Sequence, residues 1–252
     1  MNKFPNRAII IGGGYSIKEG MQFGLFDKIK TEFTVGLNSA YKFIEPTIEI
    51  WVDWSFWAGR NTEPNKDKIL QLNSLKVCNI SAIRKETSIP NDIIPLYCKG
   101  NVRPSEMFSK KAVFSPALCG YFGLTITANI LNKLTHGGEI YLLGYDFGDI
   151  GKTDNKGRAI THFYQGQIEH RGIGLIKYYK AKETNADTIF KMYVEDFPNI
   201  KIYNVSMISK INIFEKTSYQ DFFQKIKNNP IKINKPYVKS EIAKLLNTLM
   251  GV

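Results

Sequence analysis

Short apolar, β-branched runs recur along the chain and are bounded by turn-forming residues, a pattern typical of buried strands. Most of these runs are apolar at consecutive positions rather than at alternate ones, so both faces of the strands are expected to be covered. Seven such runs predict strands, at residues 8–11, 33–37, 48–52, 75–80, 94–97, 139–143 and 201–205.

Helical patterns lie between several of these runs. The clearest is at residues 121–134, where Leu124, Ala128 and Leu131 share one face before "HGG" ends the pattern. Strands that are buried on both faces and separated by helices predict an α/β fold with a mostly parallel sheet.

After residue 205 the pattern becomes helical, which predicts a main domain at 1–205 and a helical C-terminal extension at 206–252. Ser218 is placed to cap one helix, with Asp221 in its first turn, and a second helix is expected to begin at Pro236. That second helix carries one apolar face, which either packs on the main domain or forms a homo-oligomer contact. The face consists of Val238, Ile242, Leu245, Leu246 and Leu249.

The composition indicates the size of the hydrophobic core and a net positive charge, but it does not identify a binding partner. The 252 residues are 43% hydrophobic, enough for one substantial core with an appendage. There are 34 Lys and Arg against 23 Asp and Glu, a formal charge of +11. This excess is compatible with an anionic partner, either nucleic acid or a phosphate-bearing small molecule. Because the basic residues are spread over the whole chain, simple solubility explains the charge better than nucleic-acid binding does.

Cys78, Cys98 and Cys119 are odd in number and widely spaced, so they indicate neither a disulfide framework nor a zinc site. No apolar segment approaches the roughly 20 residues that cross a bilayer, and the first apolar run is too short for a signal peptide. We therefore expect a cytoplasmic protein without a membrane span.

Three consecutive glycines, Gly12, Gly13 and Gly14, connect the first predicted strand to Ser16 and a helix-compatible run. At such a junction, bare backbone N–H groups and the positive end of a helix dipole bind phosphate. Ile17 stands where a dinucleotide motif requires Gly, and no Gly-Lys-Ser/Thr follows as in a P-loop. A tight turn without a ligand is the alternative.

Two further polar residues end neighbouring strands. Asn38 follows the second strand, where its amide could bind sugar hydroxyls or a base, or simply form a turn. Asp53 follows the third strand within "WVDWSFW", where its carboxylate could hold a metal, orient a hydroxyl or cap the next helix. Trp51 is expected in the core, while Trp54 and Trp57 are candidates for contact with an acceptor.

The segments "IIIGGGYSIKEG", "GLNSAY" and "VFSPALCGYFGLTITANILNKL", the last followed by "GEIYLLGYDFG", together resemble a known family. It is the family shared by bacterial lipooligosaccharide sialyltransferases and archaeal 6-hydroxymethylpterin diphosphokinase-like proteins, with uncharacterised phage members. The resemblance covers roughly residues 7–53 and 113–172. It implies a Rossmann-like sheet with helices on both faces and a nucleotide-dependent transferase activity.

In sialyltransferases of this family the Gly-rich turn and the second-strand Asn hold a cytidine monophosphate donor, a role that carries over to Gly12, Gly14, Ser16 and Asn38. Ser115 and Asp146, inside the quoted motifs, join the donor-binding candidates.

The chain also departs from the sialyltransferase pattern. Gly13 replaces a usual Asn, Tyr15 replaces a Pro, and Gly148 stands where a Tyr contacts the donor phosphate. The diphosphokinase-like branch tolerates "D-F-G" better, so the donor is left open as a nucleotide or a nucleotide sugar.

The segment "THFYQGQIEHRG" places His162, Tyr164, His170 and Arg171 after the strand that leads to Asp146. A loop folded over the Gly turn would bring a base, a phenol and a guanidinium beside a leaving phosphate. Either histidine could take the acceptor proton, and we favour His162. A surface loop without a role is the alternative.

A divalent cation is a separate open question. Asp149 follows Asp146 closely, so Mg²⁺ stays an open alternative at this edge and no metal ligand is assigned.

The leading interpretation is a glycosyltransferase that uses a nucleotide-sugar donor and a glycan or small-molecule acceptor. One alternative is an ATP-dependent diphosphokinase acting on a pterin-like or nucleoside-like molecule. Another is a DNA-binding protein, or a phage-type transferase that modifies a base in DNA.

Overall fold

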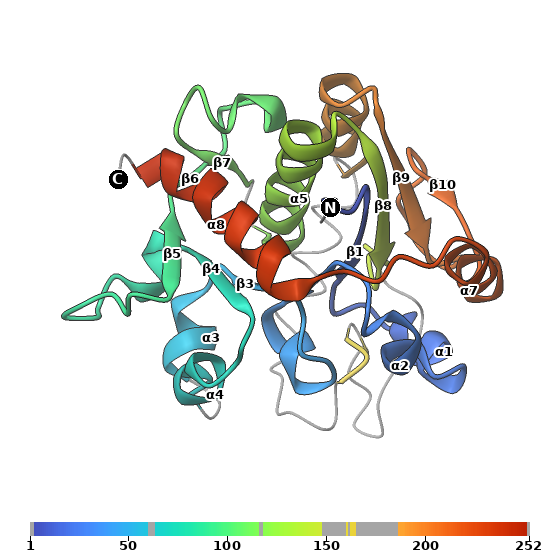
Figure 1. Ribbon diagram of the computed structural model, residues 1–252, viewed down its shortest axis with the longest axis horizontal. Coiled ribbons are helices and arrows are strands. Elements are labelled where there is room, and N and C mark those ends of the chain that lie inside the picture. The colour runs from blue at the N-terminus through green and yellow to red at the C-terminus, as the bar shows by residue number, and fades with distance from the viewer. Residues whose placement is uncertain are drawn as a thin grey trace.

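An eight-stranded sheet forms the centre of the fold, and every strand pair in it is parallel (Figure 1). The computed structural model describes residues 3–59, 64–115, 118–147, 160, 162–164 and 186–250. The strands lie in the order β10-β9-β8-β1-β2-β3-β4-β5. Their bounds are β1 (Arg7–Ile11), β2 (Thr34–Leu37), β3 (Ile48–Trp51), β4 (Leu75–Asn79), β5 (Ile93–Leu96), β8 (Gly138–Leu143), β9 (Ile200–Val205) and β10 (Glu215–Lys216). A separate pair joins β6 (Cys98–Lys99) to β7 (Val113–Phe114).

Helices cover both faces of the sheet (Figure 1). On one face lie α5 (Cys119–Thr135), α8 (Lys235–Met250) and helical residues 186–196. The other face carries short helices and the ten-residue α7. These are α1 (Ile17–Gln22), α2 (Leu25–Ile29), α3 (Trp54–Ala58), α4 (Lys66–Leu70) and α7 (Tyr219–Asn228), with 3-10 turns η1 (Asn38–Lys42) and η2 (Ile80–Ile83). A third 3-10 turn, η3 (Pro104–Glu106), packs against α5. The predicted α/β, Rossmann-like class is confirmed.

The central strand β1 shows why its run is apolar throughout. Ala8 and Ile10 point into the cluster under α5, whereas Ile9 and Ile11 point into the cluster under α1 and α2. All four side chains are fully buried. A strand with helices on both sides has no solvent face, so it has no alternating polar positions.

The order of the strands defines a switch point beside β1. From β1 the chain builds β2, β3, β4 and β5 outward on one side, then returns through α5 to place β8 on the other side. In open parallel sheets, ligands bind outside the carboxyl ends of the strands at such a reversal. The Gly12–Gly14 turn follows β1 at this point.

The C-terminal extension belongs to the same sheet and core. β10 pairs with β9, so the predicted boundary at residue 205 falls between two neighbouring strands of one sheet. Ser218 caps α7 as predicted, with its Oγ accepting the N–H of Asp221 at 3.1 Å. The apolar residues of α8 are buried in the main core, so the oligomer interpretation of that face is corrected. They are Val238, Ile242, Leu246 and Leu249.

Glu49, in the middle of β3, is a fully buried carboxyl group. Neither of its oxygens has a hydrogen-bond partner among the described residues. Burial raises its pKa well above the usual range. The folded state therefore binds more protons than the unfolded state, and stability falls as pH rises from the ordinary glutamate pKa toward the raised one.

Glu49→Gln removes this titration without changing the shape of the side chain. We expect it to raise the free energy of unfolding near pH 8 by about 1 kcal/mol or more, since each pKa unit is worth about 1.4 kcal/mol. The gain should shrink near pH 5. Urea unfolding at both pH values measures it, and an identical pH dependence in the two proteins would contradict it.

Candidate active site

Four polar or glycine segments meet at the carboxyl edge of the sheet. Gly12–Gly14 follow β1, Asn38 follows β2, Asp53 lies two residues after β3, and Asp146 lies three residues after β8. Because all these strands are parallel neighbours or near neighbours, their carboxyl ends face the same side of the molecule.

The glycine turn packs closely against the backbone that leaves β8. The N–H of Gly12 donates to the carbonyl of Leu143 at 2.8 Å, and the N–H of Gly14 donates to that of Gly144 at 2.9 Å. A Cβ added to Gly14 would lie 2.5 Å from the Gly144 oxygen, closer than atoms can approach. These contacts explain the bare backbone, and they correct the expectation that both N–H groups are open for phosphate.

Asp146 connects three segments through its carboxylate. Its Oδ2 accepts the N–H of Ser16 at 2.9 Å, and its Oδ1 accepts the hydroxyl of Ser206 at 2.8 Å. Its backbone carbonyl accepts the N–H of Lys210 at 2.8 Å, and the residue is buried. The start of α1 is thus satisfied by a protein carboxylate, which corrects the prediction that this helix end is open for phosphate.

His162 and Tyr164 lie directly against the glycine turn, as the sequence led us to expect. The two rings are 5.1 Å apart between centroids. A Cβ added to Gly13 would lie 2.5 Å from His162 Cδ2 and 3.2 Å from the Tyr164 hydroxyl oxygen. Gly13 therefore makes room for the imidazole, and a base and a phenol stand together at the switch point.

Phe163 fixes this histidine segment in place. Its N–H donates to the Gly13 carbonyl at 2.9 Å, and its buried ring lies 4.8 Å from that of Phe43. A backbone hydrogen bond and a buried aromatic side chain hold His162 at the turn. The other two predicted catalytic residues, His170 and Arg171, lie outside the described residues.

The two glycines give a matched pair of variants. In Gly13→Ala the new methyl group meets the His162 ring, which can swing away, so we expect a displaced imidazole and little loss of stability. In Gly14→Ala it meets fixed backbone, so we expect a loss of about 1–3 kcal/mol. Urea unfolding and the NMR resonances of the His162 ring measure both effects. Equal stabilities with an unmoved ring would contradict this assignment.

The N-terminus of α5 also reaches the carboxyl edge, a feature the sequence analysis missed. The Cys119 thiol lies 3.7 Å from the Ile50 carbonyl, and the Tyr145 hydroxyl donates to the Gly120 carbonyl at 3.0 Å. The helix end therefore lies between the ends of β3 and β8.

Two N–H groups at this helix end have no acceptor in the described part of the chain. The N-cap residue Leu118 gives no side-chain cap to this 17-residue helix. Among the described residues, the N–H groups of Cys119 and Gly120 have no acceptor, so they carry the positive end of the dipole. Ser115 lies just before the helix and donates its hydroxyl to the Leu118 carbonyl at 3.1 Å. In the sequence, the only indication of this open helix start was the segment "LCG", which has no side chain able to cap a helix.

Asn38 and Asp53 complete the edge. Asn38 has a left-handed backbone with φ of 53°, and its Oδ1 is buried without a hydrogen-bond partner in the described residues. Asp53 occupies the N-cap position of α3 but makes no side-chain cap. Its side chain is exposed, yet the surrounding protein displaces enough water from the carboxyl group to raise its pKa.

Two of the three tryptophans are buried, whereas the sequence predicted only one in the core. Trp51 is fully buried as expected, and Trp57 stacks on it with centroids 5.1 Å apart. The Trp57 indole N–H donates to Glu86 at 2.8 Å, so the interpretation of Trp57 as an acceptor contact is corrected. Trp54 is half-buried, with Lys85 4.4 Å above its ring.

Neither a metal centre nor a reactive thiol stands out in the described part of the chain. It contains no group of three His, Cys, Asp or Glu side chains arranged to hold a metal ion. All three cysteines are free, and burial raises the pKa of the Cys98 thiol to about 12, so this thiol stays protonated near neutral pH. Asp149 lies outside the described residues.

Comparison with known proteins gives one distant likeness. No family model and no curated protein matches the chain. A solved structure of the MAf glycosyltransferase from Magnetospirillum magneticum AMB-1 is similar at 12% identity with a TM-score of 0.49. The match covers 99% of this chain and 38% of that one. A likeness at this level does not define an activity. Among the described helices, none combines the length and apolar character needed to cross a membrane.

Proposed function

We propose that this protein is a nucleotide-dependent transferase, and specifically a glycosyltransferase that uses a nucleotide-sugar donor. The observation that carries the proposal is the contact of His162 and Tyr164 with Gly13 at the switch point of a parallel sheet. That place combines the ligand-binding edge of the fold with a candidate general base.

The N-terminus of α5 is the proposed binding site for the donor phosphate. The N–H groups of Gly12, Gly14 and Ser16 already donate to protein acceptors, whereas those of Cys119 and Gly120 do not among the described residues. A leaving phosphate gains negative charge during transfer, and oriented N–H donors with a helix dipole stabilise such charge. Asn38, at the end of β2, is the residue for the sugar or base of the nucleotide.

The reaction follows from this placement. The acceptor hydroxyl oxygen forms a bond to the anomeric carbon of the donor sugar while the bond from that carbon to the phosphate oxygen breaks. The electron pair of the broken bond goes to the nucleotide phosphate, at the start of α5. The acceptor proton passes to the imidazole of His162, beside which the Tyr164 ring lies at 5.1 Å between centroids.

Isothermal titration calorimetry against CMP, UDP, ADP and ATP, with and without Mg²⁺, tests the proposal. We expect a pyrimidine nucleotide to bind more tightly than ATP. Tighter binding of ATP that requires Mg²⁺ would favour a diphosphokinase instead, and no binding at millimolar concentration would remove both enzyme functions.

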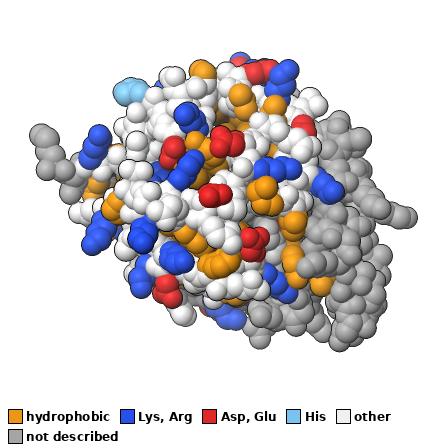
Figure 2. Space-filling model, turned by 90° about the vertical axis from the view of Figure 1, so that its right-hand side faces the viewer, with side chains coloured by type: hydrophobic (Ala, Val, Ile, Leu, Met, Phe, Trp, Pro, Cys, Tyr) orange, Lys and Arg blue, Asp and Glu red, His pale blue; other side chains and the backbone are white. Residues whose placement is uncertain are grey.

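The alternative function, DNA binding, is tested by measuring affinity for a DNA duplex at several salt concentrations. Its signature is duplex affinity that falls steeply with salt. On the face in Figure 2, basic side chains are dispersed among acidic and uncharged ones rather than gathered into a stripe. We therefore expect weak duplex binding with a shallow salt dependence.

A further inference from the structure

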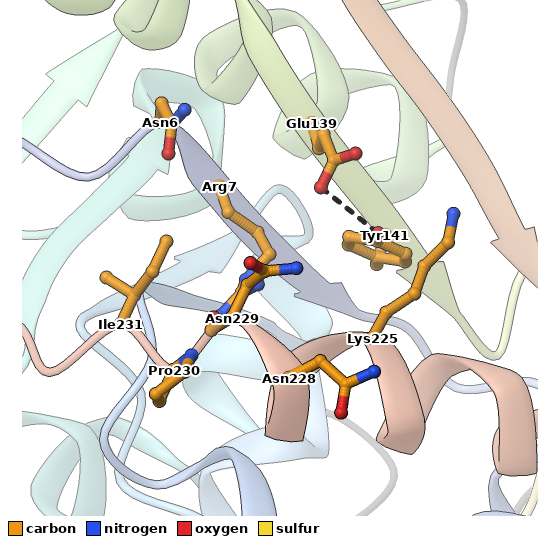
Figure 3. A pocket seen from close by; sticks show the side chains of 9 residues that line it. All are labelled: Asn6, Arg7, Glu139, Tyr141, Lys225, Asn228, Asn229, Pro230 and Ile231. Carbon is orange, nitrogen blue, oxygen red and sulfur yellow. Dashed lines mark hydrogen bonds between the residues drawn. The ribbon is translucent and has the colours of Figure 1, made fainter.

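A cavity of about 590 Å³ opens at the amino edge of the sheet, opposite the candidate active site (Figure 3). It lies where β1 and β8 begin and where α7 ends. Arg7 and Glu139 line it from the two strands, and Lys225 lines it from the helix. Its volume is within the range of small-molecule sites in proteins.

The walls of this amino-edge cavity are fixed by buried contacts. Arg7 forms a bidentate ion pair with Glu32, at 2.6 and 3.1 Å, and both side chains are buried. The same guanidinium donates to the Asn229 carbonyl at 2.9 Å, and the N–H of Ile233 donates to the Thr31 carbonyl at 3.2 Å. The chain that leaves α7 is thereby held against the start of β1.

The charges around the cavity nearly balance. The Lys225 ammonium lies 3.9 Å from the centroid of the Tyr203 ring and has no acidic partner among the described residues. Glu139 accepts the Tyr141 hydroxyl at 3.1 Å and has no cationic partner in the same part of the chain. In the sheet Glu139 is in register with Arg7 on β1 and with Lys201 on β9, so its carboxylate has cationic cross-strand neighbours on both sides. The cavity therefore presents an ammonium group and a carboxylate within a nearly neutral lining.

The remaining lining offers both hydrogen-bond donors and acceptors. Asn6, Asn228 and Asn229 contribute amides, and Pro230 and Ile231 form an apolar flank (Figure 3). A hydroxyl group donates and accepts at once, so paired amides, an ammonium and a carboxylate suit a molecule that carries several hydroxyls. The apolar flank suits the C–H face of a sugar ring.

We propose that the amino-edge cavity binds a neutral saccharide unit. Lys225 and the asparagine amides donate to its hydroxyl oxygens, and Glu139 accepts from its hydroxyl groups. The site is separate from the carboxyl edge, so it stands independently of the transferase function proposed above.

Saturation-transfer NMR and calorimetry with glucose, galactose, mannose and N-acetylglucosamine test this site. We expect at least one of these sugars to bind the intact protein at millimolar concentration. Lys225→Met and Glu139→Gln should each raise its dissociation constant about tenfold, the effect of losing one hydrogen bond to a charged group. Lys227→Met is the matched control, because this exposed lysine is on the same turn of α7 but outside the lining.

Three results would overturn the proposal. One is that none of the four sugars binds. Another is that inorganic phosphate or the free amino acid glycine binds while the sugars do not. The third is that sugar binding is unchanged in Lys225→Met and Glu139→Gln, or is lost in His162→Ala. The last result would place the sugar at the carboxyl edge.

Discussion

Replacing His162 with Ala is expected to lower kcat by about 10²–10⁴-fold, the usual contribution of a general base. The nucleotide dissociation constant should change by no more than about twofold, because the proposed site for the donor phosphate is the start of α5 and not the imidazole. The reason is geometric. Gly13 leaves space for this ring beside the Tyr164 hydroxyl, and the Phe163 N–H is bonded to the Gly13 carbonyl. Steady-state kinetics and calorimetry on the same preparation measure both quantities.

Two controls make this experiment specific. His136, the exposed left-handed residue after α5, is far from the carboxyl edge, so His136→Asn should retain full turnover. Added imidazole should restore part of the activity of His162→Ala, since it replaces the lost base. Unchanged kcat in His162→Ala would contradict the assigned role. An equal loss of nucleotide affinity would do the same, because it would make His162 a donor contact.

The second large effect concerns stability. Arg7→Met is expected to lower the free energy of unfolding by about 3–5 kcal/mol, because it leaves the Glu32 carboxylate buried without its partner. Burial already raises the pKa of Glu32 in spite of the lowering effect of Arg7, so the desolvation cost outweighs the attraction in the intact pair. Urea or thermal unfolding at neutral pH measures the loss.

The double variant Arg7→Met/Glu32→Met shows whether stability is lost because a buried charge has no partner or because the arginine side chain no longer packs. With both charges gone, most of the stability should return, since an apolar pair of similar volume tolerates burial better than a single charge. Lys244→Met breaks an exposed pair with Glu241 and should leave stability nearly unchanged. A double variant as unstable as Arg7→Met would contradict this account of the pair.

The sequence predicted the sheet well because parallel strands leave an unambiguous signal. Each of the seven predicted runs corresponds to a strand, and the helix expected at 121–134 is α5 with a few more residues at its N-terminus. The two-residue strands β6, β7 and β10 are too short to show a period, so they were missed. The five-residue helix α4 follows a polar stretch that contains Pro64 and was missed for the same reason.

The neighbours at the glycine turn were predictable from the sequence, but their hydrogen bonds were not. Gly13, His162 and Tyr164 could be grouped because each follows a strand that ends at one edge. Nothing local to Ser16 indicates that its N–H is satisfied by Asp146, which lies 130 positions away. That long-range bond moved the expected phosphate site from the start of α1 to the start of α5. Long-range partners of this kind depend on how β8 leaves the sheet, which no local pattern encodes.

The most direct test is a crystal structure of the protein soaked with the nucleotide that binds most tightly. We expect its phosphate within hydrogen-bonding distance of the N–H groups of Cys119 and Gly120, with His162 facing the open side of that phosphate. A phosphate bound at the amino edge, or a carboxyl edge filled by the protein's own side chains, would contradict the proposed active site.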